Sequence, residues 1–322
     1  MDVVLTIDTE VYPRNENWRT EGLRGDIDRD IYGIVGGQEY GVRYQSQVLT
    51  HHGLKGTFMV EGLFASAPEV GPEPLRELVR LIQDGGHEVQ LHMHPEWVPY
   101  IPGIGVPDRG YLTTSYSLAE QTELLGLALR NVRAAGARDV IAFRAGDYAA
   151  NADTLRALES LGIRFDTSYN IDYVHRTCAV PHDGRLGGMY RIGGIWEVPI
   201  AAFEDYPGHY RPAQLSACSE AELTHALTRA AGLGCEKFVI VFHSFEMLAN
   251  RWHPTRQPTV RKRVVDRFEG LCSFLATNRD TFRVVGFSDV SPSAESTSYH
   301  IKGNLWNTLL RNAQQAIDRV QA

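Results

Sequence analysis

Short apolar segments alternate with longer amphipathic segments along most of this 322-residue chain. The short segments predict buried strands, and apolar residues recur at helical spacing in the longer ones. The predicted strands are 3–7, 57–60, 87–92, 139–143, 163–166, 195–200, 237–242 and 282–287. The predicted helices are 40–53, 72–86, 117–137, 151–162, 219–234, 260–278 and 303–322. This alternation indicates an α/β fold with a mostly parallel sheet and helices outside it.

The number of strands favours one barrel. About eight strands over some 290 residues fit a barrel better than two small domains, although an open doubly wound sheet remains an alternative. The glycine-rich phosphate fingerprint is absent after the first strand, which argues against a dinucleotide fold. We therefore expect a catalytic barrel over residues 1–290. Residues 291–322 are expected to form a Ser-rich linker and a C-terminal amphipathic helix, which packs on the body or mediates a homo-oligomer.

Charge and apolar content limit the partners. The net charge of -7 argues against nucleic acid, because a phosphate backbone needs a basic surface. No apolar segment approaches the length of about 20 residues that spans a bilayer. The run 3–7 lacks the basic start and cleavage site of a signal peptide, so a cytoplasmic location is expected. The four cysteines, Cys178, Cys218, Cys235 and Cys272, form no CxxC pair and are expected to be buried thiols.

Two long polar segments interrupt the alternation. Residues 11–37 follow the first predicted strand, and residues 95–115 follow the third. Irregular segments of this length in a compact domain are often lids or binding loops. We expect both to be irregular and to set specificity.

Polar residues follow the predicted strands where each strand ends. The carboxyl ends of barrel strands converge on one face, where catalytic groups lie. The residues at those ends are Asp8 and Glu10, His92 and His94, Arg144 and Asp147, Asp166, and His243. Each alone has a plain alternative, such as a core histidine, a turn acid or half of a structural ion pair. Five strands delivering such groups to one face favour a functional site.

The spacing of these residues predicts a metal site. His92 and His94 are two residues apart, so an extended segment turns both imidazoles to the same side. Two imidazoles and one carboxylate are the ligand set of a catalytic zinc ion with an open position. Asp8 and Glu10 are also two apart, so that one could bind the metal while the other acts as general base. His243 could act as general acid, because its pKa lies near neutral pH.

Four segments, taken in order, resemble the motifs of polysaccharide deacetylases of the NodB-homology, carbohydrate esterase family 4 type. They are LTIDTE (5–10), GHEVQLHMHPEW (86–97), FRAGDYAANADTLRALESLGIRFDTS (143–168) and FVIVFHS (238–244). The resemblance covers roughly residues 1–290 and implies this family's fold, a distorted (β/α)7–8 barrel.

The resemblance also implies catalytic roles. Asp8 would be the general base and Arg144 would hold it. Asp166 would pair with and tune His243, the general acid. A backbone N–H near Asp147 would help to hold the oxyanion.

Glu10, His92 and His94 would hold one divalent metal, for which Zn²⁺ is the best candidate. The usual Asp-Asp-Gly is replaced by Asp8-Thr9-Glu10, so base and ligand could be exchanged. The two histidines are two residues apart instead of the usual four. Glu96 stands at the usual second spacing and is an alternative ligand, but the His94-Pro95 pair favours His94.

The family's usual Trp of the fourth motif is missing, since Asn170 stands at that spacing. Trp97 or Trp196 could supply an aromatic surface instead.

The implied activity is metal-dependent removal of an N-acyl group, in the first place N-acetyl, from an amino sugar or a sugar-containing intermediate. One alternative is hydrolysis of another C–N bond by the same fold, in a cyclic amide or a formamide. Another is a non-catalytic carbohydrate-binding protein. The sequence favours a small-molecule or glycan substrate and does not identify it.

Overall fold

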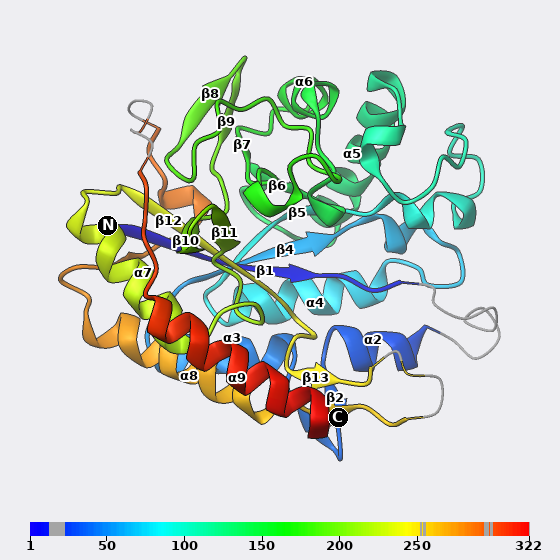
Figure 1. Ribbon diagram of the computed structural model, residues 1–322. Helices are drawn as coiled ribbons and strands as arrows, with labels where there is room; N and C mark the ends of the chain where they lie inside the picture. Colours follow the sequence, from blue (N-terminus) through cyan, green and yellow to red (C-terminus); the bar gives the residue numbers. More distant parts are fainter. Residues whose placement is uncertain (13–22, 252, 254–255, 293–295, 297–298, 322) are drawn as a thin grey trace.

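The computed structural model describes residues 1–12, 23–251, 253, 256–292, 296 and 299–321. In these residues, a curled and mostly parallel sheet is flanked by helices (Figure 1). All eight predicted strands form. They are β1 Asp2–Thr9, β4 Gly56–Glu61, β5 Glu88–Met93, β6 Ala142–Ala145, β7 Phe165–Asp166, β9 Ile195–Glu197, β12 Lys237–His243 and β15 Arg283–Val284.

The strand order identifies the architecture. The sheet runs β12-β1-β4-β5-β6-β7-β9, with parallel pairing throughout this run. Apart from β12, each strand is added on the same side as the one before, whereas a doubly wound sheet reverses direction part-way. β12 then lies against β1. The predicted distorted barrel is therefore confirmed, and the doubly wound alternative is wrong.

The barrel is distorted where its two edges meet. Past β9, a short antiparallel strand, β8 (Tyr190–Ile192), pairs with the sheet. The chain that follows β9 reaches β12 through isolated parallel bridges, Ile200 to Val239 and Gln214 to Val241. β15 pairs only with the first residues of β1. Among the described residues, isolated bridges thus replace a continuous ladder at this seam.

All seven predicted helices form. They are α3 Val42–His51, α4 Glu73–Asp84, α5 Leu118–Ala134, α6 Ala152–Ser160, α7 Glu220–Gly232, α8 Lys262–Thr277 and α9 Leu305–Gln321. Capping boxes fix the starts of α5, α6 and α7, at Ser117, Asn151 and Ser219.

The four cysteines are buried and free, as predicted. No helix of the described residues combines the length and the apolar character needed to cross a membrane.

The segment 11–37 is more regular than predicted. Residues 13–22 lie outside the described residues, but α2 (Arg24–Asp30) and a hairpin of β2 (Ile34–Val35) and β3 (Gln38–Glu39) follow. Within α2, Arg29 bonds to Asp26 at 2.6 Å and to Asp30 at 3.0 Å, and Ile27 is buried. Two helical turns held mainly by ion pairs show too little apolar periodicity to be recognised in a sequence.

Two further hairpins were not predicted either. They are β10 (Ala202–Tyr206) with β11 (His209–Pro212), and β13 (Leu248–Ala249) with β14 (Thr259–Val260).

The register of the sheet aligns polar residues on neighbouring strands. Asp8 of β1 stands opposite His243 of β12. His92 of β5 stands between Glu61 of β4 and Arg144 of β6. These pairs lie near the carboxyl ends of their strands, so the main-chain ladder itself gathers the predicted site.

The C-terminal helix α9 lies on the outside of the molecule against α7 (Figure 1). Its inward face is polar, because the buried Arg311 pairs with Asp205 at 3.1 Å and Glu222 at 3.0 Å. Up to residue 315, where the side chains of α9 are described, four large apolar side chains face outward instead: Leu305, Trp306, Leu309 and Leu310. Lys302, just before α9, bridges to Glu204 of β10. The division of the chain at residue 290 stays a prediction.

Candidate metal and catalytic site

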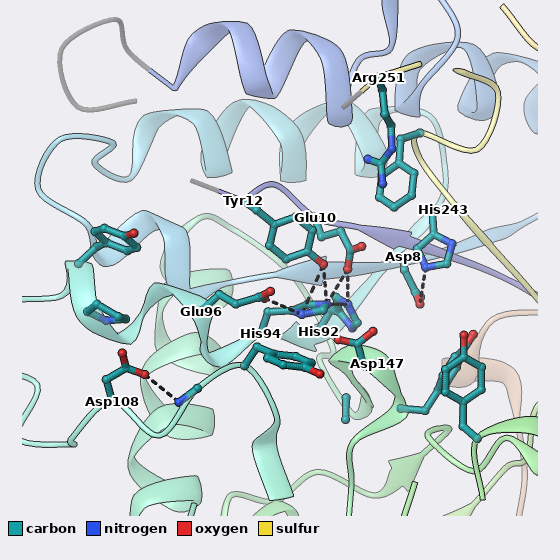
Figure 2. A pocket seen from close by; sticks show the side chains of 18 residues that line it. Asp8, Glu10, Tyr12, His92, His94, Glu96, Asp108, Asp147, His243 and Arg251 are labelled. Carbon is teal, nitrogen blue, oxygen red and sulfur yellow. Dashed lines mark hydrogen bonds and ion pairs between the residues drawn. The ribbon is translucent and has the colours of Figure 1, made fainter. Parts of the chain in front are cut away.

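An open cleft of about 660 Å³ lies at the carboxyl ends of the strands (Figure 2). Its floor includes most of the residues that the sequence predicted: Asp8, Glu10, His92, His94, Asp147 and His243. The loop after β5 supplies another wall, with Glu96, Pro99, Tyr100, Asp108, Gly110 and Tyr111. The predicted segment 95–115 therefore does border the site, although it contains two short 3-10 turns, Pro95–Tyr100 and Thr113–Ser115.

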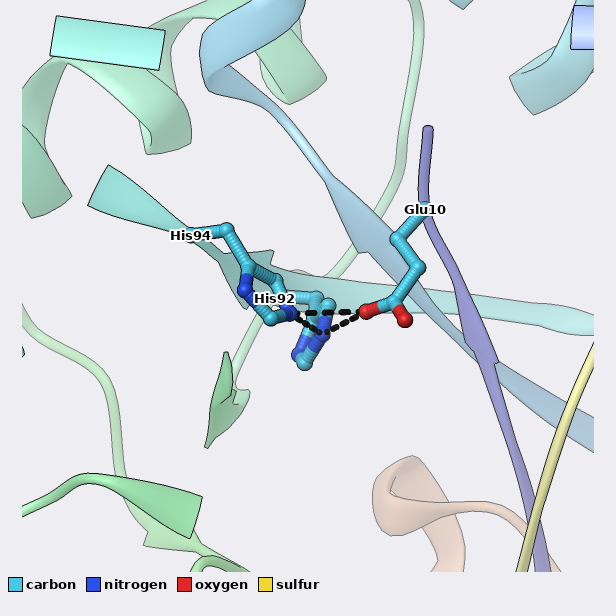
Figure 3. A group of neighbouring side chains, drawn as sticks. All are labelled: Glu10, His92 and His94. Carbon is cyan, nitrogen blue, oxygen red and sulfur yellow. Dashed lines mark hydrogen bonds and ion pairs between the residues drawn. The ribbon is translucent and has the colours of Figure 1, made fainter. Parts of the chain in front are cut away.

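Glu10, His92 and His94 form one buried cluster (Figure 3). Oε2 of Glu10 lies 2.8 Å from Nε2 of His92 and 2.7 Å from Nε2 of His94. The two Nε2 atoms are 3.1 Å apart. One carboxylate oxygen and two imidazole nitrogens thus converge on one point, as the sequence predicted.

The remaining ring nitrogens show which atoms are available to a metal. Nδ1 of His92 lies 2.8 Å from the carbonyl oxygen of Arg144. A carbonyl only accepts, so Nδ1 carries the proton, and in the neutral ring Nε2 is left with its lone pair toward Glu10. Such a lone pair facing a carboxylate oxygen is unfavourable unless a positive charge lies between them. A divalent cation fits this donor set, and zinc commonly takes these ligands.

Glu96 lies behind His94 and not among the converging atoms. Its Oε2 is 3.0 Å from Nδ1 of His94, on the side of the ring away from Glu10. Carboxylates in this position orient a metal-binding histidine and raise its basicity. The geometry therefore supports His94, with Glu96 as its partner, over Glu96 as the third ligand.

The electrostatic field at the cluster favours positive charge. Burial alone would raise the pKa of Glu10, but the two imidazoles, His94 foremost, hold that pKa well below its usual value. Burial also opposes charge on His94, yet Glu10 and Glu96 raise its pKa well above the usual value. A site that draws a proton so strongly offers the same attraction to a metal cation.

Gly146 permits the close seating of His94. It lies in the turn after β6, and a Cβ added there would overlap the ring of His94. Only glycine lets the main chain approach the imidazole this closely.

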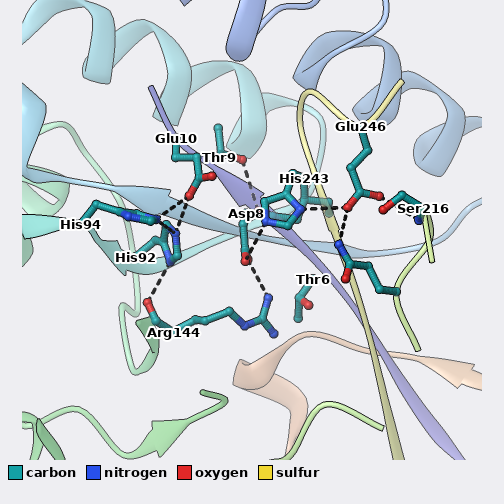
Figure 4. Close-up of polar contacts among 12 residues, drawn as sticks. Thr6, Asp8, Thr9, Glu10, His92, His94, Arg144, Ser216, His243 and Glu246 are labelled. Atoms are coloured by element: carbon teal, nitrogen blue, oxygen red, sulfur yellow. Dashed lines mark hydrogen bonds and ion pairs between the residues drawn. The ribbon is translucent and has the colours of Figure 1, made fainter. Parts of the chain in front are cut away.

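Asp8, Arg144 and His243 form a second group beside the cluster (Figure 4). Nη1 of Arg144 donates to Oδ1 of Asp8 at 2.6 Å, and both side chains are buried. Nε2 of His243 lies 3.8 Å from Oδ2 of Asp8. The contact that the resemblance implies between Arg144 and Asp8 is therefore present, while the catalytic roles of these residues stay predictions.

The implied pairing of Asp166 with His243 is wrong. Nδ1 of His243 lies 2.9 Å from Oε1 of Glu246 instead. Asp166 accepts a hydrogen bond from Ser168 at 2.7 Å. Glu246 follows His243 by three residues in the turn after β12 and so reaches the imidazole locally, whereas Asp166 at the end of β7 is bonded to its own neighbour Ser168.

Glu246 is expected to set the pH dependence of His243. Burial lowers the pKa of His243, but the hydrogen bond and charge of Glu246 raise it to about 9. A general acid works only while protonated, so activity should fall as pH rises through that pKa. Glu246→Gln removes the charge, and the basic limb of the kcat/KM profile should move to lower pH.

Asp166→Asn provides the comparison for this experiment, measured as a pH–rate profile of each variant. The basic limb should stay where it is in Asp166→Asn. A shift in this variant and none in Glu246→Gln would restore the pairing that the resemblance implied.

The predicted aromatic surface is also different. Trp97 is fully buried, and its indole N–H donates to the carbonyl of Val11 at 3.1 Å. Trp196 lies on β9, and neither tryptophan is among the described residues that line the cleft. Tyrosines and one phenylalanine replace them: Tyr12, Tyr100, Tyr111, Tyr148, Tyr173 and Phe245. Because they come from separate turns and loops, no sequence pattern marks them as a set.

Tyr12 is the aromatic residue closest to the cluster. Its hydroxyl lies 2.9 Å from Nε2 of His94. It follows Glu10 by two residues, and this i, i+2 spacing after the first strand is the signal that could have revealed it.

No protein-family model matches the sequence, and no curated protein matches it. Solved structures do. A protein assigned as a polysaccharide deacetylase from Mycobacterium smegmatis is 16% identical, with a TM-score of 0.53 over 89% of this chain and 87% of that one. A family 4 carbohydrate esterase from Streptomyces lividans, in complex with acetate, is 13% identical, with a TM-score of 0.45 over 92% and 96%. A 4-alpha-glucanotransferase from Thermococcus litoralis is 16% identical, with a TM-score of 0.52 over 95% of this chain and 42% of that one.

The chain therefore has the fold of the polysaccharide deacetylase from Mycobacterium smegmatis. The fold alone does not select a reaction, because the glucanotransferase matches it about equally well. Any conclusion about the reaction must therefore rest on the side chains in the cleft.

Proposed function

We propose that this protein is a metal-dependent hydrolase that removes an N-acyl group, in the first place N-acetyl, from an amino sugar or a sugar-containing intermediate. The observation that carries the proposal is the convergence of the Glu10, His92 and His94 donor atoms beside Asp8 and His243. A metal site, a candidate base and a candidate acid around one cleft are the components of metal-assisted amide hydrolysis. The shared fold with a deacetylase supports the same reading.

Glu10, His92 and His94 would hold one divalent metal, and their donor set suits Zn²⁺. When bound, the metal polarises the acyl oxygen and makes water more acidic.

Asp8 serves as the general base. As the oxygen of a water attacks the acyl carbon, the Asp8 carboxylate accepts a proton from that water. Arg144, at 2.6 Å, fixes the orientation of the carboxylate.

His243 serves as the general acid. When the C–N bond breaks, the nitrogen leaves with the bonding electrons and takes a proton from the imidazolium of His243. Glu246 keeps His243 protonated, since it raises the pKa to about 9. The products are a carboxylic acid, acetic acid for an acetyl group, and the free amine. Asp8 then loses its proton to solvent and His243 takes one up from solvent, which restores both groups.

The walls of the cleft support a carbohydrate as the rest of the substrate. Tyr100 and Tyr111 offer aromatic faces, and Asp108 on the same loop offers a carboxylate that can accept bonds from hydroxyl groups. A glycan or small sugar needs both kinds of contact.

A substrate panel tests the proposal. Purified protein, loaded with Zn²⁺, is incubated with N-acetylated amino sugars, cyclic amides and formamides, and acetate, ring opening and formate are measured. Release of acetate from an amino sugar is the expected result. Ring opening or formate release alone would favour the other C–N hydrolases, and binding of sugars without any turnover would favour a carbohydrate-binding protein.

Two further predictions of the sequence stand without a test in the structure. A cytoplasmic location is one. Assembly of two copies through the C-terminal helix is the other, and the outward face of Leu305, Trp306, Leu309 and Leu310 is the surface that a second copy would cover. Measurement of the molar mass in solution, compared with 36.0 kDa for one chain, decides that second prediction.

A further inference from the structure

Tyr148 occupies an unusual position in the wall of the cleft. It follows Asp147 in the turn after β6, and both residues have positive φ angles, 51° and 55°. Residues other than glycine rarely adopt this conformation. Where they do, the surrounding structure holds them in it, and such residues cluster at functional sites. The turn follows β6 directly, so Tyr148 is carried on the same piece of chain as Arg144, the residue that holds the proposed base.

The hydroxyl of Tyr148 is buried without a hydrogen-bond partner among the described residues. The side chain is only 5% exposed, yet it lines the cleft. Leaving a buried hydroxyl unpaired is costly, and native structures seldom do so without a reason. Tyr190 shows the usual arrangement, since it is 6% exposed and its hydroxyl donates to the carbonyl of Pro181 at 3.1 Å.

The surroundings of Tyr148 indicate what its hydroxyl can bind. Burial raises the pKa of Tyr148 well above its usual value, and Asp8 is the charged group that adds most to this effect. The phenol therefore keeps its proton, so that its hydroxyl is available as a hydrogen-bond donor in the wall of the cleft that Asp8 also lines. An amide brings one strong acceptor into that space, its acyl oxygen.

We propose that the hydroxyl of Tyr148 donates a hydrogen bond to the acyl oxygen of the scissile amide, and that this bond strengthens as the acyl carbon becomes tetrahedral. The inference rests on the proposed function. The oxygen gains negative charge during attack, and hydrogen bonds to a charged acceptor are roughly twice as strong as those to a neutral one. Because the Tyr148 hydroxyl has no other hydrogen bond among the described residues to break, it needs little rearrangement when that negative charge appears.

Tyr148→Phe tests the inference, because it removes the hydroxyl and keeps the ring, which packs 4.5 Å from that of Tyr173. We expect kcat for acetate release to fall by about 10²- to 10³-fold, the loss typical of a missing oxyanion donor, with KM nearly unchanged. The thermal unfolding midpoint should stay the same or rise, because an unpaired buried hydroxyl is removed.

Tyr190→Phe is the matched control, and the opposite pattern is expected: a lower unfolding midpoint and an unchanged kcat. Three results for Tyr148→Phe would overturn the inference while leaving the proposed function intact: wild-type kcat, a raised KM with unchanged kcat, or a fall in kcat together with a lower unfolding midpoint. A wild-type protein that hydrolyses no N-acyl amide would overturn both.

Discussion

Asp8→Asn should lower kcat by about 10²- to 10⁴-fold, the usual contribution of a general base. Asparagine has nearly the same shape and keeps one oxygen that can accept the hydrogen bond from Arg144, which Oδ1 of Asp8 now accepts at 2.6 Å. It cannot accept a proton from water. Because the shape and the hydrogen bond are kept, the variant should fold. Its stability should be lower, since the buried Arg144 loses its counter-charge. Steady-state kinetics of acetate release would measure the effect.

The metal content of Asp8→Asn is the control for this experiment. The variant should bind as much zinc as the wild type, because Glu10, His92 and His94 are unchanged. Loss of the metal would mean that Asp8 is the ligand and Glu10 the base, the exchange that the sequence leaves open. Full activity would remove Asp8 from the mechanism altogether.

His94→Ala should leave the protein without stoichiometric metal and without activity. The imidazole supplies one of three converging donors, and its Nε2 lies 2.7 Å from Glu10. With it gone, two donors remain, which is fewer than the three protein ligands usual in catalytic zinc sites. Elemental analysis after loading with Zn²⁺ and dialysis would measure the number of metal ions per chain, with one expected for the wild type.

Glu96→Gln is the matched variant for His94→Ala. Since Glu96 contacts only the far nitrogen of the ring, the variant should still load one metal ion, with an affinity about 10- to 100-fold weaker. The reverse result, with metal lost in Glu96→Gln and retained in His94→Ala, would make Glu96 the third ligand.

The sequence allowed the barrel to be predicted because each β/α unit leaves a separate local signal. The runs 3–7 and 237–242 are almost entirely apolar, as expected of strands buried on both faces, and they form the adjacent strands β1 and β12. The short hairpins and α2 gave no such signal. In α2, Arg29 and its two acidic partners hold a helix that buries only one large apolar side chain, Ile27.

The residues of the candidate site likewise fall into two groups, those that the sequence predicted and those that it did not. Asp8, His92 and His243 could be found because they stand at the ends of predicted strands, and parallel strands end on one face. Glu246 and Tyr148 could not be found in this way. They lie in the turns after β12 and β6, and the periodicity of apolar residues does not predict the geometry of a turn. The resemblance was misleading for Asp166, since this chain supplies the partner of His243 from the adjacent turn.

The strand register has a practical consequence for engineering. Asp8 stands opposite His243, and His92 opposite Arg144, through main-chain hydrogen bonds inside the sheet. The cleft residues that we propose to contact the rest of a substrate, such as Tyr100 and Tyr111, come from the segment after β5 and lie outside that ladder. Variation within segment 99–112 would therefore change the proposed ligand contacts and keep the strand register of the reactive groups, provided that Ile101 and Val106, which are buried in the core, are retained. The strands would hold the proposed reactive groups in place while changes in this segment alter the selectivity for substrates.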